Sequence, residues 1–286
     1  MAEFKIGRII ELHPDKKIME DRFRLTHDLG MNSLQILSYF KQHRTDENAE
    51  HIVMLCKKYD IEIATLWTGW TPLVKGMWSF YLGQQTLGLV PVAFRANRLE
   101  EMRGAIPFAK KIGAPFMTSH VGYLPENPYD DNYIGTVVAL KVLCTDLKNA
   151  GMGFNFETGQ ETPTTLLRAI EDIGTENVGL NLDPANLISY GKANPCDAMD
   201  TIGDYVRGTH IKDAVYPTNP RDTGGEVPLG QGKVDFPKLI KLLNEHKYKG
   251  HFNIEREILE GEEYYNDVKN AMNMIKTEYD KYNWDF

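Results

Sequence analysis

With 286 residues, of which 42% are hydrophobic and 25% charged, the chain has the composition of a globular protein with one large domain or two small ones. A formal charge of −8 disfavours a nucleic-acid partner, and no apolar run approaches the ~20 residues of a membrane span. Three cysteines and an N-terminus without a signal-peptide pattern argue against a disulfide framework and predict a cytoplasmic location.

Strand-like and helix-like patterns alternate along the chain. We expect eight strands, at residues 4–10, 33–39, 61–66, 115–120, 153–157, 178–183, 206–212 and 251–256. Helices are expected between and after them, at residues 19–29, 46–59, 98–112, 132–150, 164–173, 195–202, 236–246 and 262–281. Eight β–α units without a linker predict an α/β fold, a closed (β/α)₈ TIM barrel that forms one domain over residues 1–286. An open doubly wound sheet is the alternative, but no GxGxxG turn follows the first strand.

The segment 67–97 interrupts this alternation. It holds Trp67, Trp70 and Trp78 among several glycines. Because it follows the third strand, we expect an insertion that covers the mouth of the barrel as a lid, with Trp67 or Trp70 against a sugar substrate. The alternative is that these aromatic residues form a small core of their own.

Four chemically reactive residues each end a strand-like run, on four consecutive predicted strands. They are Glu157, Asp183, His210 and Glu255. In a barrel of parallel strands, the C-terminal ends of the strands share one mouth and carry the active site. We therefore expect the four side chains to converge. The alternative for each acidic residue is that it caps the following helix.

Three carboxylates that converge need a cation, because like charges raise one another's pKa. A divalent metal meets this need, with His210 as the fourth ligand beside Glu157, Asp183 and Glu255. Three oxygens and one nitrogen suit a fairly hard ion such as Mn²⁺ or Mg²⁺, with Co²⁺ or Zn²⁺ as alternatives. A structural zinc site is disfavoured, because the set contains no thiolate.

Three asparagines lie two residues before the acidic residues, on the same face of each strand. Asn155, Asn181 and Asn253 would point into the barrel one layer below the candidate ligands. Bulky branched residues normally fill that layer, so the asparagines are predicted to orient the carboxylates from beneath. If the strands begin facing outward, the asparagines meet solvent instead.

Further candidates surround the same mouth. His120 ends the fourth strand and could contact a ligand or be structural, and Lys212 shares a face with His210. Arg221 lies in the glycine-rich loop 214–232, where barrels often bind phosphate, and could hold a phosphate group. The acidic residues of the same loop favour an unphosphorylated sugar slightly over a phosphate ester.

With these residues in view, the chain resembles the xylose isomerase-like TIM-barrel superfamily over nearly its whole length. The resemblance is to the sugar phosphate isomerase/epimerase branch, with ketose 3-epimerases and inosose dehydratase as relatives. The motifs that carry it are ETGQE at 157–161, NLDPANL at 181–187, HIKD at 210–213, PLGQGKVDF at 228–236 and IERE at 254–257. They are specific for the superfamily and weak for the substrate.

The resemblance implies that Glu157, Asp183, His210 and Glu255 bind one divalent metal, often Mn²⁺, and that the two glutamates move the substrate proton. Epimerases of free ketoses tend to carry a substrate-binding histidine where this chain has Asn186, as does the pentulose-5-phosphate epimerase branch. The endonuclease four branch needs further His and Asp ligands that these motifs do not offer, which disfavours DNA repair.

We therefore expect a metal-dependent isomerase or epimerase that acts on a ketose or ketose phosphate through an enediolate. Elimination in the same site is one alternative, giving a dehydratase or lyase that acts on a keto-sugar, an inosose or a keto-glycoside. A non-catalytic sugar-binding barrel is the other. A small sugar is the expected partner, and homo-oligomer formation stays open.

Overall fold

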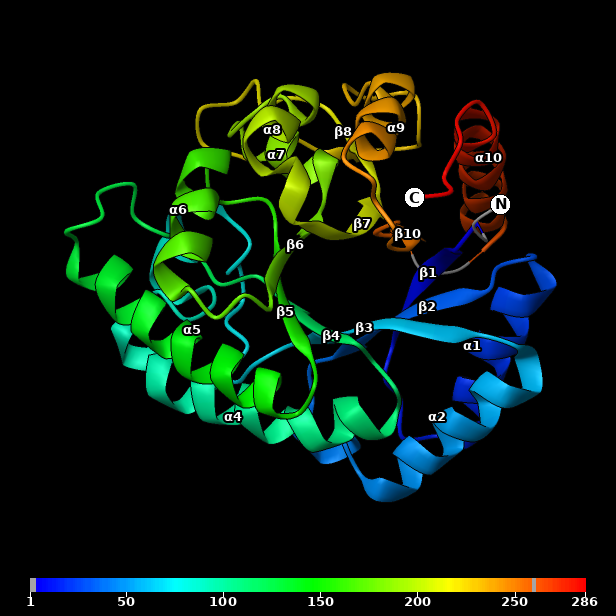
Figure 1. Ribbon diagram of the computed structural model, residues 1–286, viewed down its shortest axis with the longest axis horizontal. Helices are drawn as coiled ribbons and strands as arrows, with labels where there is room; N and C mark the ends of the chain where they lie inside the picture. The colour runs from blue at the N-terminus through cyan, green and yellow to red at the C-terminus, as the bar shows by residue number, and fades with distance from the viewer. Residues whose placement is uncertain (1–3, 259–260) are drawn as a thin grey trace.

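Eight parallel strands close into a barrel at the centre of the molecule (Figure 1). The computed structural model describes residues 4–258 and 261–286. The barrel strands are β1 Ile6–Glu11, β2 Ser33–Ser38, β3 Glu62–Thr68, β4 Phe116–Ser119, β5 Gly153–Glu157, β6 Val178–Leu182, β7 Val206–Ile211 and β10 Phe252–Ile254. Around the barrel they follow the order β1-β10-β7-β6-β5-β4-β3-β2, so the last strand pairs with the first. The predicted (β/α)₈ barrel is confirmed.

Helices surround the strands on all sides in Figure 1. The main ones are α1 Lys16–Asp28, α2 Asp46–Tyr59, α4 Val92–Lys111, α5 Asp131–Asn149, α6 Pro163–Ile173, α8 Pro195–Ile202, α9 Phe236–Glu245 and α10 Glu262–Tyr279. Short elements lie near the mouth and between the units: α3 Phe80–Thr86, α7 Pro184–Ser189, the 3₁₀ turns Lys41–His43 and Gly203–Tyr205, and the hairpin of β8 Asp213–Ala214 with β9 Glu226–Val227. Within the described part of the chain, no helix is long and apolar enough to cross a membrane.

The largest difference from the sequence prediction concerns the segment after the third strand. Strand β3 continues through Trp67 and Thr68, and helix α4 begins at Val92 instead of residue 98. The connecting segment is therefore 69–91 and not 67–97. Pro91 precedes the first turn of α4, a position where proline is well tolerated because no helical N–H is required there.

Helix α7 was also missed, although its start carries a recognisable signal. Asp183 is the N-cap and Pro184 the first helical residue, a common pairing at helix starts. The Asp183 side chain accepts a hydrogen bond from the backbone N–H of Asn186 at 2.9 Å. The helix is only six residues long, too short for hydrophobic periodicity to show it.

Two apolar cores hold this arrangement. The main core lies between the strands and the helices and includes Phe154, Phe156 and Phe252, all nearly fully buried. A separate small cluster joins segment 69–91 to β3. It contains Trp67 of β3 and Trp70, Met77 and Leu87 of the segment. The first core fixes the barrel, and the second fixes the segment that adjoins its mouth.

Candidate metal centre

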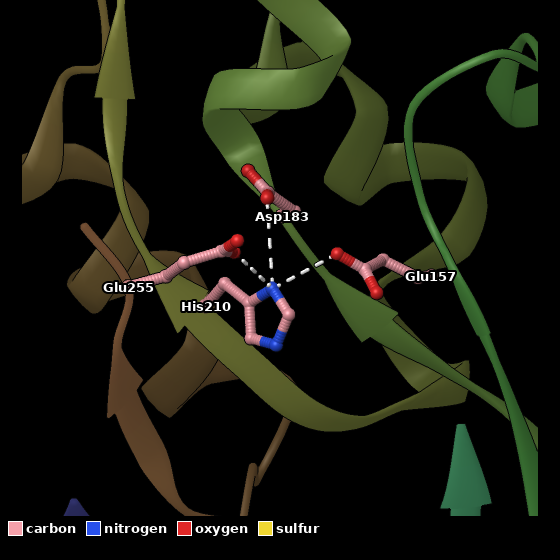
Figure 2. Close-up of side chains that lie close together, drawn as sticks. All are labelled: Glu157, Asp183, His210 and Glu255. Carbon is pink, nitrogen blue, oxygen red and sulfur yellow. Dashed lines mark ion pairs between the residues drawn. The ribbon is translucent and has the colours of Figure 1, made fainter. Parts of the chain in front are cut away.

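Four consecutive strands bring the predicted ligands together at the C-terminal end of the barrel (Figure 2). Glu157 is the last residue of β5, and His210 lies in β7. Asp183 and Glu255 directly follow β6 and β10. Each side chain offers one ligand atom, and these four atoms all lie within 4.8 Å of one another. The spacing of the strands therefore produces the convergence that the sequence predicts.

The ligand atoms are close together but are not aligned for hydrogen bonding with one another. His210 Nδ1 lies 3.0 Å from Glu157 Oε1, 2.8 Å from Glu255 Oε2 and 3.5 Å from Asp183 Oδ2. Even so, His210 Nδ1, Asp183 Oδ2 and Glu255 Oε2 find no hydrogen-bond partner among the described residues. Buried polar atoms are rarely left in this state, because each unpaired one costs ~1–3 kcal/mol. Atoms that point at a common centre are the arrangement expected of ligands around a cation.

The imidazole of His210 is oriented from its far side. Its Nε2 lies 3.1 Å from the Gln35 Oε1 on β2, so Nε2–H donates to this amide oxygen. The Nδ1 lone pair is then directed at the carboxylates, as in many histidines that bind metals. Burial alone would lower the pKa of His210, but Glu157 and Glu255 raise it well above its usual value. Without a cation, the carboxylates therefore keep a proton on this ring.

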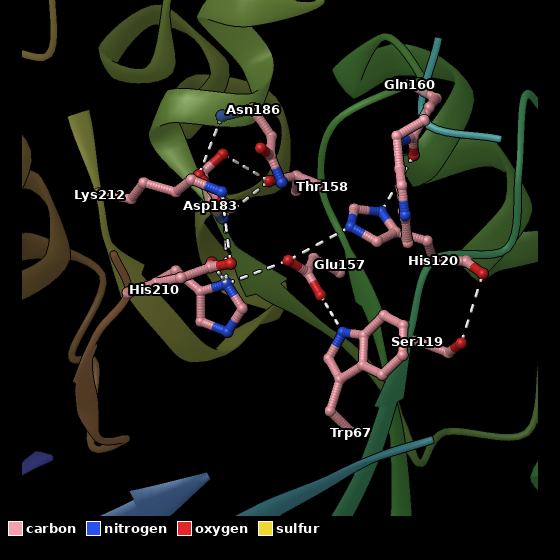
Figure 3. A network of polar contacts seen from close by, with 12 residues as sticks. Trp67, Ser119, His120, Glu157, Thr158, Gln160, Asp183, Asn186, His210 and Lys212 are labelled. Atoms are coloured by element: carbon pink, nitrogen blue, oxygen red, sulfur yellow. Dashed lines mark hydrogen bonds and ion pairs between the residues drawn. The ribbon is translucent and has the colours of Figure 1, made fainter. Parts of the chain in front are cut away.

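Asp183 uses its two oxygens differently. Oδ1 accepts the N–H of Asn186 and so caps α7, while Oδ2 is directed at the cluster without a hydrogen-bond partner. Thr158 accepts a hydrogen bond from the backbone N–H of Asp183 and donates one to its carbonyl oxygen (Figure 3). The helix cap and the candidate ligand are thus the same carboxylate, held in one orientation by its own backbone contacts.

Glu157 is the most strongly held carboxylate. The Trp67 indole N–H donates to Oε2, and His120 Nε2 lies 3.3 Å from Oε1 (Figure 3). His120 donates through Nδ1 to the Gln160 side-chain oxygen at 3.0 Å. Burial would raise the pKa of Glu157, but His120 and His210 lower it well below its usual value. Glu157 is therefore an ionised carboxylate in spite of its complete burial.

Lys212 is the second cation of the site. Its Nζ lies 3.3 Å from Glu255 Oε1, 3.3 Å from Glu257 Oε1 and 3.9 Å from Asp183 Oδ2. Burial opposes its charge, but Glu255 and Asp183 raise the pKa of Lys212 well above its usual value. In turn, burial is outweighed at Glu255, where Lys212 and His210 lower the pKa to about 2.

The donor set fits a divalent cation. Three carboxylates and one imidazole are available, their free atoms converge, and the second nitrogen of the histidine is held by an amide. No thiol takes part, so hard ions such as Mn²⁺ and Mg²⁺ suit the set better than a structural zinc does.

Comparison with known proteins identifies the family of this barrel. The family model described as "Xylose isomerase-like TIM barrel" matches residues 23–277. The chain belongs to this family. A xylose isomerase domain protein from Planctomyces limnophilus is 31% identical, with a TM-score of 0.89 over 97% of this chain and 98% of that one.

More distant structures share the fold of this xylose isomerase-like barrel. An L-ribulose 3-epimerase is 16% identical, with a TM-score of 0.74 over 98% of this chain and 95% of that chain. A family protein from Mycobacterium smegmatis, solved in complex with magnesium, is also 16% identical, with a TM-score of 0.72 over 97% of each chain.

Two curated relatives are uncharacterised proteins. MJ1311 of Methanocaldococcus jannaschii is 24% identical over 56% of this chain and 57% of its own length. YihM of Escherichia coli is 26% identical over 49% of this chain and 42% of its own length. The chain thus spans about half the length of the curated relatives that it matches.

Within this family barrel, the three predicted asparagines do line the interior, but away from the ligands. Asn155, Asn181 and Asn253 are at most 1% exposed. No hydrogen bond joins them to the four candidate ligands in the described part of the chain, and several of their amide atoms have no partner. The contacts that orient the ligands come instead from Gln35 and Trp67. An orienting role for the asparagines stays a prediction without a contact to support it.

Segment 69–91 is anchored from below. The buried Arg98 guanidinium donates to the carbonyl oxygens of Thr86, Gly88 and Pro72, at 2.5, 2.7 and 3.0 Å. It also lies 5.4 Å from the centre of the Trp70 ring. Trp70 is only 1% exposed and packs in the small apolar cluster, as in the alternative that gave these aromatic residues a core of their own.

Trp78 was not among the predicted site residues, yet it lies beside His120, a neighbour of Glu157. Its ring contacts the His120 ring edge-on at 5.2 Å and is 39% exposed. The sequence offered no signal that separates these tryptophans, since all three lie in one irregular segment. A lid role for the segment stays a prediction. Trp78 is the tryptophan of this segment that contacts His120, whereas Trp67 belongs to β3 and donates to Glu157.

Arg221 is not brought to the cluster. It is exposed in the loop after β8, and no ion pair of its guanidinium is found within the described residues. The loop itself is held by Asp213, whose carboxylate accepts hydrogen bonds from four backbone N–H groups. These belong to Ala214, Gly230, Gly232 and Val234, at 2.9–3.1 Å. The Asp of the HIKD motif therefore closes the base of the loop.

One further carboxyl group near the mouth escaped the sequence analysis. Glu161 is 2% exposed, and neither of its oxygens has a hydrogen-bond partner. Burial raises its pKa to about 8, although His120 and Lys192 oppose the shift. Glu161 is therefore neutral near pH 7, unlike Glu157 four residues earlier. The ETGQE motif contains both residues, but spacing alone does not distinguish an ionised from a protonated carboxyl group.

Proposed function

We propose that the protein is a divalent-metal-dependent isomerase or epimerase that moves a proton on the carbon beside the carbonyl group of a ketose. The observation that carries this proposal is the pair Glu157 and Glu255. The two carboxylates approach His210 from opposite sides (Figure 2), at 3.0 and 2.8 Å from Nδ1. Two ionised carboxylates across one small site can remove a proton from one face of a substrate and return it to the other.

Glu157, Asp183, His210 and Glu255 would hold the metal. Bound there, the metal would act as a Lewis acid toward the oxygens of the sugar and make the neighbouring C–H more acidic. Mn²⁺ is our first choice and Mg²⁺ our second, with Co²⁺ or Zn²⁺ as alternatives, because oxygen donors dominate the set. The magnesium complex of the Mycobacterium smegmatis protein supports a hard divalent ion.

The residues around the two glutamates prepare them for proton transfer. Trp67 and His120 fix the Glu157 carboxylate on one side of the site, and Lys212 holds Glu255 on the other. Both carboxylates have a lowered pKa, so both begin the reaction as bases. One removes the substrate proton, and the other takes a proton from solvent before it protonates the opposite face, so that either glutamate can serve as the base, depending on the configuration of the substrate.

The substrate is proposed to be a free ketose-sized sugar and not a phosphate ester. Lys212, the cation beside the cluster, already faces three carboxylates, and Arg221 is exposed in its loop. Lys212 is thus already paired, and no contact joins Arg221 to the cluster within the described residues, so the proposal places no phosphate-binding group beside the metal. His120, Asn186 and Trp78 line the same mouth and would contact hydroxyl groups and the apolar face of a sugar ring. The epimerases of sugars among the fold relatives are consistent with this class.

Exchange of substrate hydrogen with solvent deuterium tests the proposal. The Mn²⁺-loaded protein is incubated in D₂O with free hexuloses and pentuloses and with their phosphate esters, and deuterium on the sugar carbons is followed by NMR. We expect incorporation beside the carbonyl of a free ketose, and little in the Glu157→Gln and Glu255→Gln variants. Loss of water from a keto-sugar would assign the dehydratase alternative. Absence of any exchange or elimination, with sugar binding retained, would favour a binding barrel.

A further inference from the structure

The N-terminal end of the barrel, opposite the candidate metal centre, encloses a cavity of about 320 Å³. Its walls are residues within the barrel strands or just before them, together with the loop before β10. They include Asn155, Asn181, Asn253, Arg207, Lys247 and Lys249. Layers of bulky branched side chains fill this region in most barrels. Here Gly208 has no side chain, and asparagines take the place of the branched residues.

The inner wall of the cavity consists of amide groups that lack partners. Asn155 Oδ1, Asn253 Oδ1 and both amide atoms of Asn181 have no hydrogen-bond partner among the described residues. All three side chains are at most 1% exposed. An amide buried without a hydrogen bond is costly, so these groups call for an occupant that both donates and accepts hydrogen bonds. Hydroxyl groups do both.

The entrance of the cavity carries positive charge. Arg207, Lys247 and Lys249 are exposed there, and none has an ion-pair partner within the part of the chain that the structure describes. The Arg207 stem is placed by Gly179, where an added Cβ would lie 2.5 Å from Arg207 Cγ. Three uncompensated cations thus border one opening of a protein whose formal charge is −8.

The histidines of the entrance add no free charge to this group. His246 Nδ1 pairs with Asp204 at 2.7 Å. His251 Nδ1 lies 2.7 Å from the Ser33 hydroxyl, and burial together with Lys5 lowers its pKa to about 4. The positive charge without an ion-pair partner at the opening therefore comes from the arginine and the two lysines.

We propose that this cavity is a binding site for a small hydroxylated anion of the sugar phosphate type. The phosphate would lie at Arg207, Lys247 and Lys249, and the hydroxyl groups would reach the amides of Asn181 and its neighbours. The cavity volume is at the lower end of the ~300–1,000 Å³ of ligand pockets, which limits the occupant to a small molecule. Ordered waters could satisfy the amides alone, and it is the positive charge at the entrance that favours an anionic occupant.

The site is independent of the proposed reaction, although the same strands serve both. Asn155, Asn181, Gly208 and Asn253 each stand two residues before one of the four candidate metal ligands. An occupant would therefore contact the strands directly beneath the metal centre. Its presence is tested by binding and not by turnover.

Calorimetric titration of the metal-loaded protein tests the proposal, with glucose 6-phosphate and glucose as probes. We expect glucose 6-phosphate to bind about tenfold or more tightly than glucose, because a charge-assisted hydrogen bond contributes at least ~1.4 kcal/mol. The double variant Arg207→Ala/Lys249→Ala should lose about this factor. Lys57→Ala, which removes an exposed lysine of α2, should bind as the wild type does.

Both substitutions of the double variant lie on the surface, so they should not disturb folding. Asn181→Leu offers a second, buried probe of the same site. Wild-type affinity for glucose 6-phosphate in the double variant would overturn the proposal, because the ester would then bind elsewhere. Failure of glucose 6-phosphate to bind at millimolar concentration would also overturn it. A crystal structure of the complex with the phosphate at Arg207 would establish the site.

Discussion

The two ends of the barrel are built from the same strands, by residues two positions apart on one face. The C-terminal end carries charged side chains, whereas neutral amides line the opposite cavity. At the C-terminal mouth, Glu157 is a buried carboxylate and Glu255 a half-buried one, and His210 and Lys212 lie within ion-pair distance of carboxylates there. Two residues earlier, at Asn155 and Asn253, a neutral amide takes the place of the charge. At the mouth, carboxylate oxygens outnumber the hydrogen-bond donors that face them. In the opposite cavity, amides lack hydrogen-bond partners and cations lack ion-pair partners.

The comparison shows how one strand can carry two kinds of site. An amide has nearly the shape of a carboxylate but needs no counterion, so a second polar layer can lie beneath the first without adding repulsion. Within these two layers of the strands, ionised side chains are thereby confined to the C-terminal end, where Lys212 and His210 lie. Replacing a carboxylate by an amide at the mouth should therefore affect activity, whereas replacing an amide by a carboxylate in the cavity should affect stability.

The largest effect is expected from removing charge at the mouth. Glu157→Gln and Glu255→Gln keep the size of the side chain and one oxygen but remove the base, so turnover should fall by ~10²–10⁴. Folding should survive, because a neutral amide relieves repulsion within the cluster. Steady-state kinetics on the substrate found by deuterium exchange measures the loss. Near-wild-type turnover in either variant would place proton transfer on another residue.

Adding charge at the opposite end should act on stability. Asn181→Asp places a carboxylate at a site that is 0% exposed and only two residues from Asp183. We expect a loss of about 3 kcal/mol in the free energy of unfolding, the order of a buried charge without a partner. Urea denaturation at neutral pH measures it, with the exposed Asn273→Asp as the control. An unchanged urea midpoint would mean that Arg207, Lys247 and Lys249 at the cavity entrance compensate a negative charge at position 181.

A smaller effect is expected where a neutral amide does serve the mouth. Gln35→Leu removes the acceptor for His210 Nε2–H, so metal affinity should fall ~10–100-fold, as for other groups that orient a metal-binding histidine. Gln35→Glu keeps an acceptor and should retain the metal better. Competition with a chelator measures both affinities. Equal affinities in the two variants would show that the Gln35 contact does not orient the ring.

The smallest expected effect is a pH dependence of stability that comes from Glu161. This carboxyl group lies near the mouth and, like the amides of the cavity, is neutral. Its pKa is about 8 in the folded protein, against an ordinary 4.5, so the folded state binds the extra proton between these values. Stability should therefore fall as pH rises through this window, by at most ~1.4 kcal/mol per pH unit.

Glu161→Gln should remove this dependence, because its side chain is neutral at every pH. The variant and the wild type should be equally stable near pH 4.5, and the variant should be the more stable near pH 8. Thermal unfolding across this range provides the comparison. Parallel stability curves for the two proteins would mean that Glu161 is ionised when folded.

Sequence alone was sufficient for the barrel and for the convergence of the four ligands. Both follow from short-range rules: alternation of elements sets the topology, and the last residue of each parallel strand must reach the shared mouth. Glu157 and Glu255 could therefore be placed together although 98 residues separate them. The same rules placed His120 and Lys212 at this mouth, where the structure has them in contact with carboxylates.

Contacts between distant side chains could not be predicted in this way. Gln35 is an ordinary strand residue until β7 brings His210 beside it, and Trp78 differs from Trp70 only through the packing of segment 69–91. Arg221 was selected by loop position, which says nothing about where an exposed side chain points. The cavity could not be predicted either, because it depends on how completely the side chains fill the barrel. The sequence pattern does not show whether Asn181 is packed against its neighbours or exposed.

The clamp at Asp213 has a consequence for how relatives of this protein could diverge. Because one carboxylate binds the N–H groups of Gly230, Gly232 and Val234, the two ends of the long loop meet at a fixed point beside His210. Residues 216–223, beyond the β8–β9 hairpin, lie outside that clamp. Doubling the length of such a loop costs only ~0.6 kcal/mol in closure entropy. Insertions and deletions there can change which substrates reach the mouth in different relatives, while the candidate metal ligands keep their positions.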